Sequence, residues 1–512
     1  MASYADLSSG SLVNRCDGSY FSNLDVFGAQ VLNINANPVN NFATTTAEVE
    51  GRSINGTWNN LNFCNVTVTY THPARNDEIN VFVLLPFDDW NGRFLGAGGG
   101  GWITGYPWDA VAANTADGWA VASTDGGHSH YASSAADWIL DSPGNVNINE
   151  LQNFASVALN DISVIGKHIT ATFYGTKPKK SYWSGCSTGG RQGLMLAQRY
   201  PDAFDGILAI APAINWARFL VAMYWGQQVM SELEFYPPEC ELDAITQMAV
   251  EACDEIDGLK DGIISSPGLC EFDARTLIGR RFDCNGQSKS FSEEAAGIVN
   301  AVWQGPKSKD ARYGWFGFNI GTNLTSGTVG TKCEAGSITP CTGSFGFEHI
   351  KYLVLKSPNA NLRNLTNDQY FSILHRSTQE YTSIIDTSDP DLSQFKHHGG
   401  KMLTWHGLAD QLIMPNGSSD YYKRVLDIDS HAPDFYRYFE VPGVAHCTGG
   451  SGPLPTGSLD AVIKWVEEGI APETLLAKSQ TEIEMERRVC SWPKQQIYVG
   501  GDGKGVKSFE CR

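Results

Sequence analysis

The chain has 512 residues, more than a single hydrophobic core usually serves, so we expect either two lobes or one core domain with a large insertion. A hydrophobic content of 42% with 14 Trp excludes a disordered chain. The net charge of −19 and the pI near 5.0 argue against nucleic acid and anionic membrane surfaces as partners, because both select basic patches.

The first part of the predicted core contains buried strands. Three apolar runs have strand character, and they cover residues 79–85, 93–96 and 119–125. The second run leads into four successive glycines, Gly98 to Gly101, which let the backbone fold closely under a ligand. We interpret this segment as part of an oxyanion hole, with an amide of Gly100 or Gly101 as donor. A plain surface loop is the competing interpretation of the glycines alone.

A nucleophile elbow follows in the chain. Apolar spacing predicts a helix over residues 150–174, and a strand-like run at 181–184 then enters Gly185-Cys186-Ser187-Thr188-Gly189. This segment fits Gly-x-Ser-x-Gly, a strained strand-to-helix turn that exposes a serine hydroxyl. A helix at 191–200 and a strand at 206–211 supply the context that the motif requires. Ser187 is therefore the predicted nucleophile, and the Thr188 amide is the other predicted oxyanion donor.

The pattern becomes irregular from about residue 213 to 395, with isolated predicted helices at 241–254 and 291–304. Regular alternation then returns, as a strand at 401–407, a helix at 418–426 and a strand at 435–441. We predict an α/β fold in which residues 1–212 and 396–512 form an α/β-hydrolase catalytic domain. Residues 213–395 form an inserted lid.

Two further residues complete a predicted catalytic triad. A serine hydroxyl needs an imidazole to take its proton and a carboxylate to orient that imidazole, and in α/β-hydrolases the order is Ser, Asp or Glu, His. Asp410 and His446 follow Ser187 in that order, each just after a predicted strand. Alternative acids occupy a more polar stretch: Asp427, Asp429, Asp434 and Glu440.

Cys186 and Cys447 each stand beside a predicted catalytic residue. A disulfide keeps its two Cα atoms within roughly 4.4 to 6.8 Å. If these two cysteines are bonded, Ser187 and His446 are held side by side. Together these residues predict a serine hydrolase that acts through an acyl-enzyme.

The cellular compartment is inferred from cysteines and glycosylation sequons. The 12 cysteines are even in number, and sequons begin at Asn55, Asn65, Asn323, Asn364 and Asn416. The first residues lack the features of a signal peptide, and no stretch of 18 apolar residues suggests a membrane span. We expect a secreted, extracellular eukaryotic glycoprotein whose leader was removed or replaced, rather than a cytosolic protein with free thiols.

The chain resembles the tannase and feruloyl esterase family over most of its length. The likeness is carried by Cys186-Ser187, Asp410, His446-Cys447, Trp90-Asn91-Gly92-Arg93-Phe94-Leu95, Trp303-Gln304-Gly305-Pro306 and an acidic loop at 254–263. The resemblance implies a carboxylesterase that releases ferulate, p-coumarate or caffeate from esters on plant cell-wall polysaccharides. Tannase activity on gallate esters is the alternative. A catalytically silent binding protein is a third hypothesis, which the intact Ser187 and His446 disfavour.

The same resemblance implies a structural Ca²⁺ in the lid. Asp254, Asp257 and Asp261 would be side-chain ligands, with the Leu259 and Ile263 carbonyls completing the set, and oxygen donors of this kind suit calcium. The alternative is that this acidic turn is exposed to solvent and binds no metal, which is common for such turns.

Similarity to the family also implies disulfide pairings: Cys16 with Cys64, Cys253 with Cys270, Cys333 with Cys341 and Cys490 with Cys511, which leaves Cys240 and Cys284 for each other.

In the lid, the aromatic residues of segment 313–318 either form a wall against a planar phenolic acyl group or belong to the lid core. Both interpretations remain open at this point.

Overall fold

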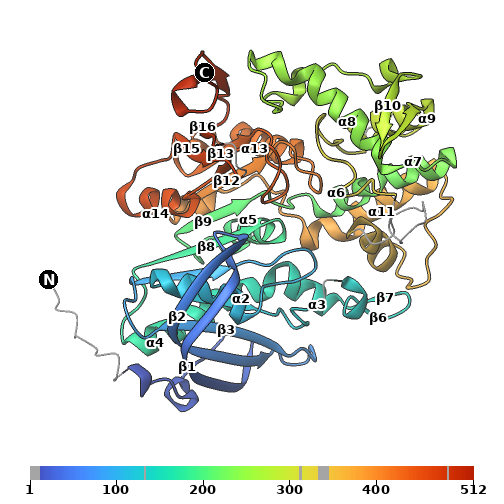
Figure 1. Ribbon diagram of the computed structural model, residues 1–512. Coiled ribbons are helices and arrows are strands. Elements are labelled where there is room, and N and C mark those ends of the chain that lie inside the picture. The colour runs from blue at the N-terminus through green and yellow to red at the C-terminus, as the bar shows by residue number, and fades with distance from the viewer. Residues whose placement is uncertain (1–11, 132–133, 311–313, 332–344, 481–483) are drawn as a thin grey trace.

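A nine-stranded mixed sheet forms the centre of the protein, which we describe from a computed structural model covering residues 12–131, 134–310, 314–331, 345–480 and 484–512. Figure 1 shows the chain from its N-terminal hairpin to its C-terminal strands. In sheet order the strands are β1 (Gln30–Val49), β2 (Arg52–Thr71), β3 (Ile79–Pro86), β5 (Ala120–Thr124), β4 (Arg93–Ala97), β8 (Lys180–Cys186), β9 (Gly206–Ile210), β12 (Lys401–Gly407) and β13 (Tyr436–Val441).

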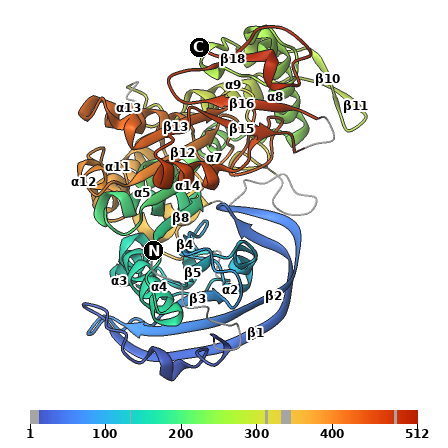
Figure 2. The same ribbon diagram turned by 90° about the vertical axis from the view of Figure 1, so that its left-hand side faces the viewer.

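The sheet is parallel from β5 through β13 and antiparallel from β1 to β5. Crossover helices on both faces are the usual consequence of parallel pairing, and this arrangement confirms the predicted α/β-hydrolase core. The β1–β2 hairpin has 20 residues in each strand and curves past the rest of the sheet in Figure 2. The sequence did not predict this hairpin, because β1 leaves most of its side chains exposed or half-buried and so carries no strong apolar alternation.

Helices cover both faces of the sheet. Alternate strand residues such as Phe94, Trp183 and Ile207 pack with α4, α5 and α13 on one face, whereas Leu95, Tyr182 and Leu208 pack with α2 and α14 on the other. The helices of the core are α2 (Trp108–Val111), α3 (Ile148–Gln152), α4 (Ala158–Tyr174), α5 (Thr188–Arg199), α13 (Asn416–Ile428) and α14 (Ser458–Glu468).

The helix predicted at 150–174 is interrupted by a π-helical turn, Asn153–Val157, between α3 and α4. The buried guanidinium of Arg191 donates to the carbonyls of Phe154 and Ala155 in this turn. These contacts give carbonyl groups of the widened turn a partner, as buried backbone requires.

The insertion lies between β9 and β12 along the chain, yet these two strands pair directly, so the sheet resumes after it. Its helices are α6 (Trp216–Met223), α7 (Trp225–Leu233), α8 (Glu239–Cys253), α9 (Glu293–Gln304), α10 (Phe345–Glu348), α11 (Asn367–Ile385) and α12 (Ser393–His397). In Figures 1 and 2 they gather at the end of the molecule away from the β1–β2 hairpin. Several of them contribute to an apolar cluster that includes Trp216, Ile298 and Leu353 together with Trp102 and Phe154 of the core. The insertion is thus more helical than its irregular sequence pattern indicated.

Short strands complete the fold: β6 (Leu140–Ser142) with β7 (Asn145–Val146), β10 (Arg281–Cys284) with β11 (Gln287–Ser290), β14 (Leu454–Pro455) with β15 (Thr474–Lys478) and β16 (Glu486–Cys490), and β17 (Gln496–Tyr498) with β18 (Phe509–Cys511).

Disulfides join Cys16 to Cys64, Cys186 to Cys447, Cys240 to Cys284, Cys253 to Cys270 and Cys490 to Cys511. Cys333 and Cys341 lie outside the described residues. Among the helices of the described residues, none combines the length and apolarity that crossing a membrane needs.

Candidate active site

Ser187 occupies a sharp turn between the end of β8 and the start of α5. Its backbone has φ 62° and ψ −118°, a conformation that side-chain-bearing residues rarely adopt. Its N–H donates to the Ile210 carbonyl at 3.0 Å, which fixes the turn against the neighbouring strand. A Cβ on Gly185 would lie 2.5 Å from the backbone of Gly189, so the elbow needs glycine there. The turn presents the Ser187 side chain at the carboxyl end of the sheet.

Asp410 and His446 come from the loops after β12 and β13 and meet above the same sheet edge. His446 Nδ1 lies 2.7 Å from Asp410 Oδ2. The other carboxylate oxygen accepts the N–H groups of Leu412 and Ile413, both at 2.8 Å. A second imidazole, His406, also bonds Oδ2, at 2.9 Å. Four hydrogen bonds therefore hold a carboxylate that has no exposed surface.

These contacts keep Asp410 ionised. Burial by itself raises the pKa of the carboxyl group, but the charge on His446 and the hydrogen bonds from His406 and His446 lower it further than burial raises it. The net pKa is well below the ordinary value. An ionised carboxylate can only accept, so His446 carries its proton on Nδ1 and leaves Nε2 free to take a proton from another group.

The alternative acids have other partners. Asp429 pairs with Lys396 at 2.5 Å, and Glu440 accepts a hydrogen bond from Ser419 at 2.6 Å. Asp427 and Asp434 are exposed. Among the described residues, only Asp410 forms a hydrogen bond or an ion pair with the His446 imidazole.

The disulfide between Cys186 and Cys447 spans the elbow and the histidine loop, with the two Cα atoms 6.0 Å apart. It places Ser187 and His446, the residues next to each cysteine, on the wall of one cavity. In the part of the chain that the structure describes, the two side chains are not hydrogen-bonded to each other. Such bonds are often long before substrate binds and tighten in the reacting complex.

If the disulfide positions the histidine, its removal should lower turnover more than folding. We expect Cys186→Ala with Cys447→Ala to lower kcat at least about tenfold at a temperature where the variant is folded, because small displacements of reacting groups are costly. The matched control removes the pair Cys490 and Cys511, which joins β16 to β18 away from the triad. It should lower the melting temperature and leave kcat unchanged. Equal kcat in both double variants would show that the first bond is only a stabilising link.

The glycine segment is joined to the start of α5. Gly189 N–H donates to the Gly99 carbonyl at 2.9 Å, and the Thr188 hydroxyl donates to the Gly101 carbonyl at 2.7 Å. Gly101 and Thr188 both line the cavity with Ser187. Gly100 instead uses its carbonyl to accept from Ile103 N–H at 3.0 Å. Of the two glycines predicted from the sequence, Gly101 is therefore the one whose backbone reaches the cavity.

The cavity beside Ser187 is small and mostly apolar. Its walls include Trp216, Phe219, Leu220 and Met223 of α6, and Leu412 and Ile413, which follow Asp410. Its volume is about 30 Å³, enough for a water molecule and far less than a small-molecule ligand needs. The side chains of α6 therefore leave little room beside Ser187 in this conformation.

The aromatic segment 313–318 does not form that wall. Trp315 and Phe318 are buried in the apolar cluster of the insertion, and Phe316 packs against the same cluster. Tyr313 lies outside the described residues. Of the two interpretations that the sequence left open, the described part of the segment follows the second and belongs to the lid core.

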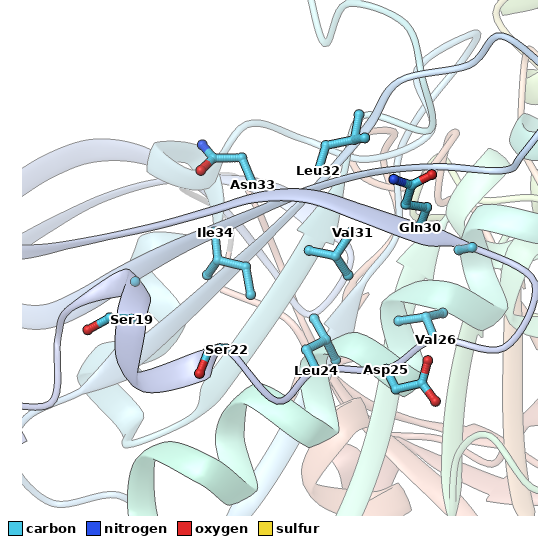
Figure 3. A pocket seen from close by; sticks show the side chains of 12 residues that line it. Ser19, Ser22, Leu24, Asp25, Val26, Gln30, Val31, Leu32, Asn33 and Ile34 are labelled. Carbon is cyan, nitrogen blue, oxygen red and sulfur yellow. The ribbon is translucent and has the colours of Figure 1, made fainter.

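A larger hollow, about 640 Å³, lies between residues 18–26 and β1. In Figure 3, Val31 and Ile34 point from β1 toward the segment that carries Ser22 and Leu24, whereas Asn33 points away from it. β1 is the edge strand of the sheet, whereas Ser187 follows β8 inside it. No histidine or cysteine lines this hollow, so its size does not make it the catalytic centre.

The acidic loop of the insertion is held by its own hydrogen bonds. Asp254 accepts N–H groups of Asp261, Gly262 and Ile263 at 2.9 to 3.2 Å. Asp257 accepts from Leu259 N–H and from a serine hydroxyl, and Asp261 pairs with the buried Arg487. The oxygen donors are of the class that Ca²⁺ prefers. Within the described residues, however, no three acidic, histidine or cysteine side chains are grouped as they would be around a metal.

Sequence reasoning missed three contributions to the site. His406 was assigned only to a strand, although it contacts Asp410, the predicted acid of the triad. Gln411 accepts the backbone N–H of His446 through Oε1 at 3.0 Å, which holds the histidine loop. Arg191, buried in α5, lies 5.7 Å from the Trp216 ring and links the elbow helix to the cavity wall. The position of Gln411 directly after Asp410 was the one available signal, because a residue next to a catalytic acid lies near the site.

A serine hydroxyl, an imidazole and an ionised carboxylate arranged in this way can carry out acyl transfer. Comparison with known proteins points to the same chemistry. The sequence profile of the family "Tannase and feruloyl esterase" matches residues 64–512. A probable feruloyl esterase of Arthroderma benhamiae is 37% identical over 462 residues, covering 88% of this chain and 86% of that protein. A tannase of Aspergillus oryzae is 29% identical over 512 residues, covering 89% and 86%.

Solved structures show the same similarity. A tannin acyl hydrolase from Aspergillus niger superposes with a TM-score of 0.87 at 28% identity, covering 98% of this chain and 95% of that one. Feruloyl esterase B from Aspergillus oryzae gives a TM-score of 0.79 at 27% identity, covering 98% and 100%. The fold, the profile match and the relatives agree: the chain belongs to the tannase and feruloyl esterase family and is a carboxylic ester hydrolase.

Proposed function

We propose that this esterase hydrolyses hydroxycinnamate esters (ferulate, p-coumarate and caffeate) attached to plant cell-wall polysaccharides. The observation that carries the proposal is the apolar wall beside Ser187, which offers Trp216, Phe219, Leu220 and Met223 to the acyl group. The 37% identical relative, a probable feruloyl esterase, supports the same choice. A tannase is also among the relatives, so gallate esters are the alternative substrate class.

The chemistry of the wall separates the two classes. A feruloyl or p-coumaroyl ring carries one phenolic hydroxyl, whereas a galloyl ring carries three. A hydroxyl that enters an apolar cavity without a hydrogen-bond partner loses about 1 to 3 kcal/mol of binding free energy. The side chains of α6 that face the cavity are apolar apart from the indole N–H of Trp216. The wall therefore favours the acyl group with fewer hydroxyls.

In this proposal Ser187 attacks the ester carbonyl while His446 Nε2 takes the hydroxyl proton, and Asp410 holds the imidazole in the required tautomer. Amides of Thr188 and Gly101 donate to the oxygen that gains negative charge. The alcohol leaves with the proton from His446, and an acyl-enzyme remains on Ser187. Water, deprotonated by His446, then releases the phenolic acid.

The acyl group needs more room than the cavity provides. At about 30 Å³ the space cannot hold an aromatic ring, so the α6 wall must move when substrate enters. Met223 is unbranched and can change rotamer at small cost, which makes it the first side chain expected to yield. Substrate entry is thus coupled to a local displacement of the lid.

Hydrolysis of methyl ferulate, methyl p-coumarate, methyl caffeate and methyl gallate, measured in parallel, tests the proposal. We expect kcat/KM for ferulate and p-coumarate to exceed that for gallate by at least about tenfold, since two additional hydroxyls are left unpaired. Met223→Gln places an amide on the same wall at similar volume and should reduce that ratio. A preference for gallate would make the protein a tannase. Inactivity toward all four esters would contradict a phenolic ester substrate.

We also propose that the acidic loop binds one structural Ca²⁺ through Asp254, Asp257 and Asp261 with the Leu259 and Ile263 carbonyls. The oxygen donors support this, although in the conformation described the carboxylates are bonded to the loop itself. We expect chelation with EDTA to lower the melting temperature, Ca²⁺ to restore it, and Asp257→Asn to remove both effects. A protein without metal by elemental analysis, whose melting temperature does not respond to EDTA or Ca²⁺, would contradict the proposal.

We propose that the protein is secreted and extracellular. The disulfides of the described residues support this, since such bonds form and persist in an oxidising compartment. The sequon asparagines Asn55, Asn323, Asn364 and Asn416 are exposed, as attachment of a glycan requires, while Asn65 is half-buried in β2. Secretion would place the enzyme where plant cell-wall polysaccharide esters are found.

A further inference from the structure

A second histidine, besides His446, contacts the acid of the proposed triad. His406 is the penultimate residue of β12 and is fully buried. Its Nε2 lies 2.9 Å from Asp410 Oδ2 and 3.2 Å from the carbonyl of Ile413. Its Nδ1 lies 2.8 Å from the Ser418 hydroxyl. The two imidazoles thus bond the same carboxylate oxygen.

The partners of His406 define its tautomer. Nε2 faces two oxygens that can only accept, the ionised carboxylate and a backbone carbonyl, so Nε2 carries the proton. Nδ1 faces a hydroxyl, which can donate to it. Ser418, in the first turn of α13, then satisfies the remaining nitrogen without a second proton on the ring. The neutral Nε2–H form therefore uses every polar atom of the ring, as a fully buried polar group requires.

We propose that His406 is a positioning residue for catalysis: with its tautomer set by Ser418, it donates to Asp410 Oδ2 and fixes the orientation and charge of the carboxylate that serves His446. The proposal rests on the catalytic roles given above to Asp410 and His446. Two backbone N–H groups hold Oδ1, whereas among the described residues His406 is the one donor to Oδ2 besides His446 itself. Without that donor, Oδ2 can rotate away from the direction of His446.

The charged neighbours of His406 are few. Asp410 and, through it, His446 face the ring from the loops after β12 and β13. On β13, Glu440 is in register with His406, and its carboxylate accepts a hydrogen bond from Ser419. Removing the His406 donor leaves more negative charge on Oδ2, which favours the protonated form of the catalytic imidazole. In a profile of kcat against pH, the acid limb, where kcat falls as the pH is lowered, should then move to higher pH.

A pair of amide variants tests the proposal. In Gln the side-chain amide nitrogen can occupy the place of Nε2, whereas in Asn it can occupy only the place of Nδ1. We expect His406→Asn to lower kcat about ten- to hundredfold, with little change in KM, and to move the acid limb upward by at least about 0.5 pH unit. His406→Gln should retain most of kcat and the pH profile of the original protein. Rates are expressed per active site titrated with a fluorophosphonate, so that misfolded protein does not contribute.

Ser418→Ala tests the same chain of hydrogen bonds with the imidazole kept. It should cause a smaller loss of kcat with a shift of the acid limb in the same direction, whereas Ser419→Ala on the same helix should leave both unchanged. All variants are produced in a host without N-glycosylation, because Ser418 belongs to the sequon of Asn416.

Equal losses in His406→Asn and His406→Gln, or losses with an unmoved acid limb in both His406→Asn and Ser418→Ala, would overturn the proposal and leave His406 as a structural residue. Asp410→Asn distinguishes this failure from failure of the triad. If Asp410→Asn is inactive while His406→Asn is fully active, only the role of His406 is wrong. If Asp410→Asn is itself active, the catalytic assignment fails first.

Discussion

Ser187→Ala is expected to lower kcat/KM on phenolic methyl esters by about 10⁴-fold or more, because no acyl-enzyme can form without the hydroxyl. The fold should be retained, since the backbone conformation of the elbow is fixed by its hydrogen bond to Ile210 and by the tight packing of Gly185 against Gly189. Alanine also keeps a Cβ at this position. Initial rates together with circular dichroism and the melting temperature check both parts of this expectation.

Ser184→Ala is the matched control, because Ser184 lies on β8, three residues before Ser187. Its hydroxyl is buried and has no hydrogen-bond partner among the described residues. Removing it should leave kcat/KM unchanged and the stability equal or slightly higher. Substantial esterase activity in purified Ser187→Ala would mean that another residue is the nucleophile.

Asp410→Asn should be nearly as damaging, with a loss in kcat of about 10³-fold or more. The asparagine oxygen would accept the N–H groups of Leu412 and Ile413, which leaves its NH₂ group facing His406 and His446. An NH₂ group can only donate. His446 would then need an unprotonated Nδ1 and would carry its proton on Nε2, the nitrogen that must take the proton from Ser187.

The control for the acid is Asp427→Asn, an exposed residue of α13 and one of the alternatives that the sequence allowed. Its kcat should equal that of the original protein. The pKa of Asp410 is held well below the ordinary value by His446 and His406 despite burial, so the original carboxylate stays charged near neutral pH. If Asp427→Asn lost activity and Asp410→Asn kept it, the acid would be misassigned.

Much of the site was predictable from local sequence because the chemistry dictates its spacing. Gly185 and Gly189 flank the serine where an elbow admits no larger side chain, and Asp410 and His446 follow strands whose carboxyl ends meet at one sheet edge. Cys186 and Cys447, each next to a predicted catalytic residue, indicated from the sequence alone that these segments lie together. The strands of the central sheet other than β1 and β2 were found within one or two residues, because they are buried and apolar.

Other features depend on contacts that a sequence pattern does not contain. The α6 helix is buried on nearly every side, with Arg218 as its one exposed residue, so it lacks the polar face that gives a helical period. The β1–β2 hairpin has the opposite composition, with many exposed Asn and Thr side chains. His406 looks like an ordinary strand residue until the loop after β12 folds back and brings Asp410 onto its Nε2.

The central claim is that Ser187 is activated by His446 and Asp410 across the Cys186–Cys447 disulfide, and covalent trapping tests it most directly. The folded protein is treated with a fluorophosphonate, digested, and examined by peptide mass spectrometry while residual esterase activity is followed. We expect one adduct, on the peptide that contains Ser187, to accumulate in proportion to the activity lost, and Asp410→Asn to label much more slowly. An adduct on a different residue, or full activity remaining after Ser187 is modified, would contradict the account.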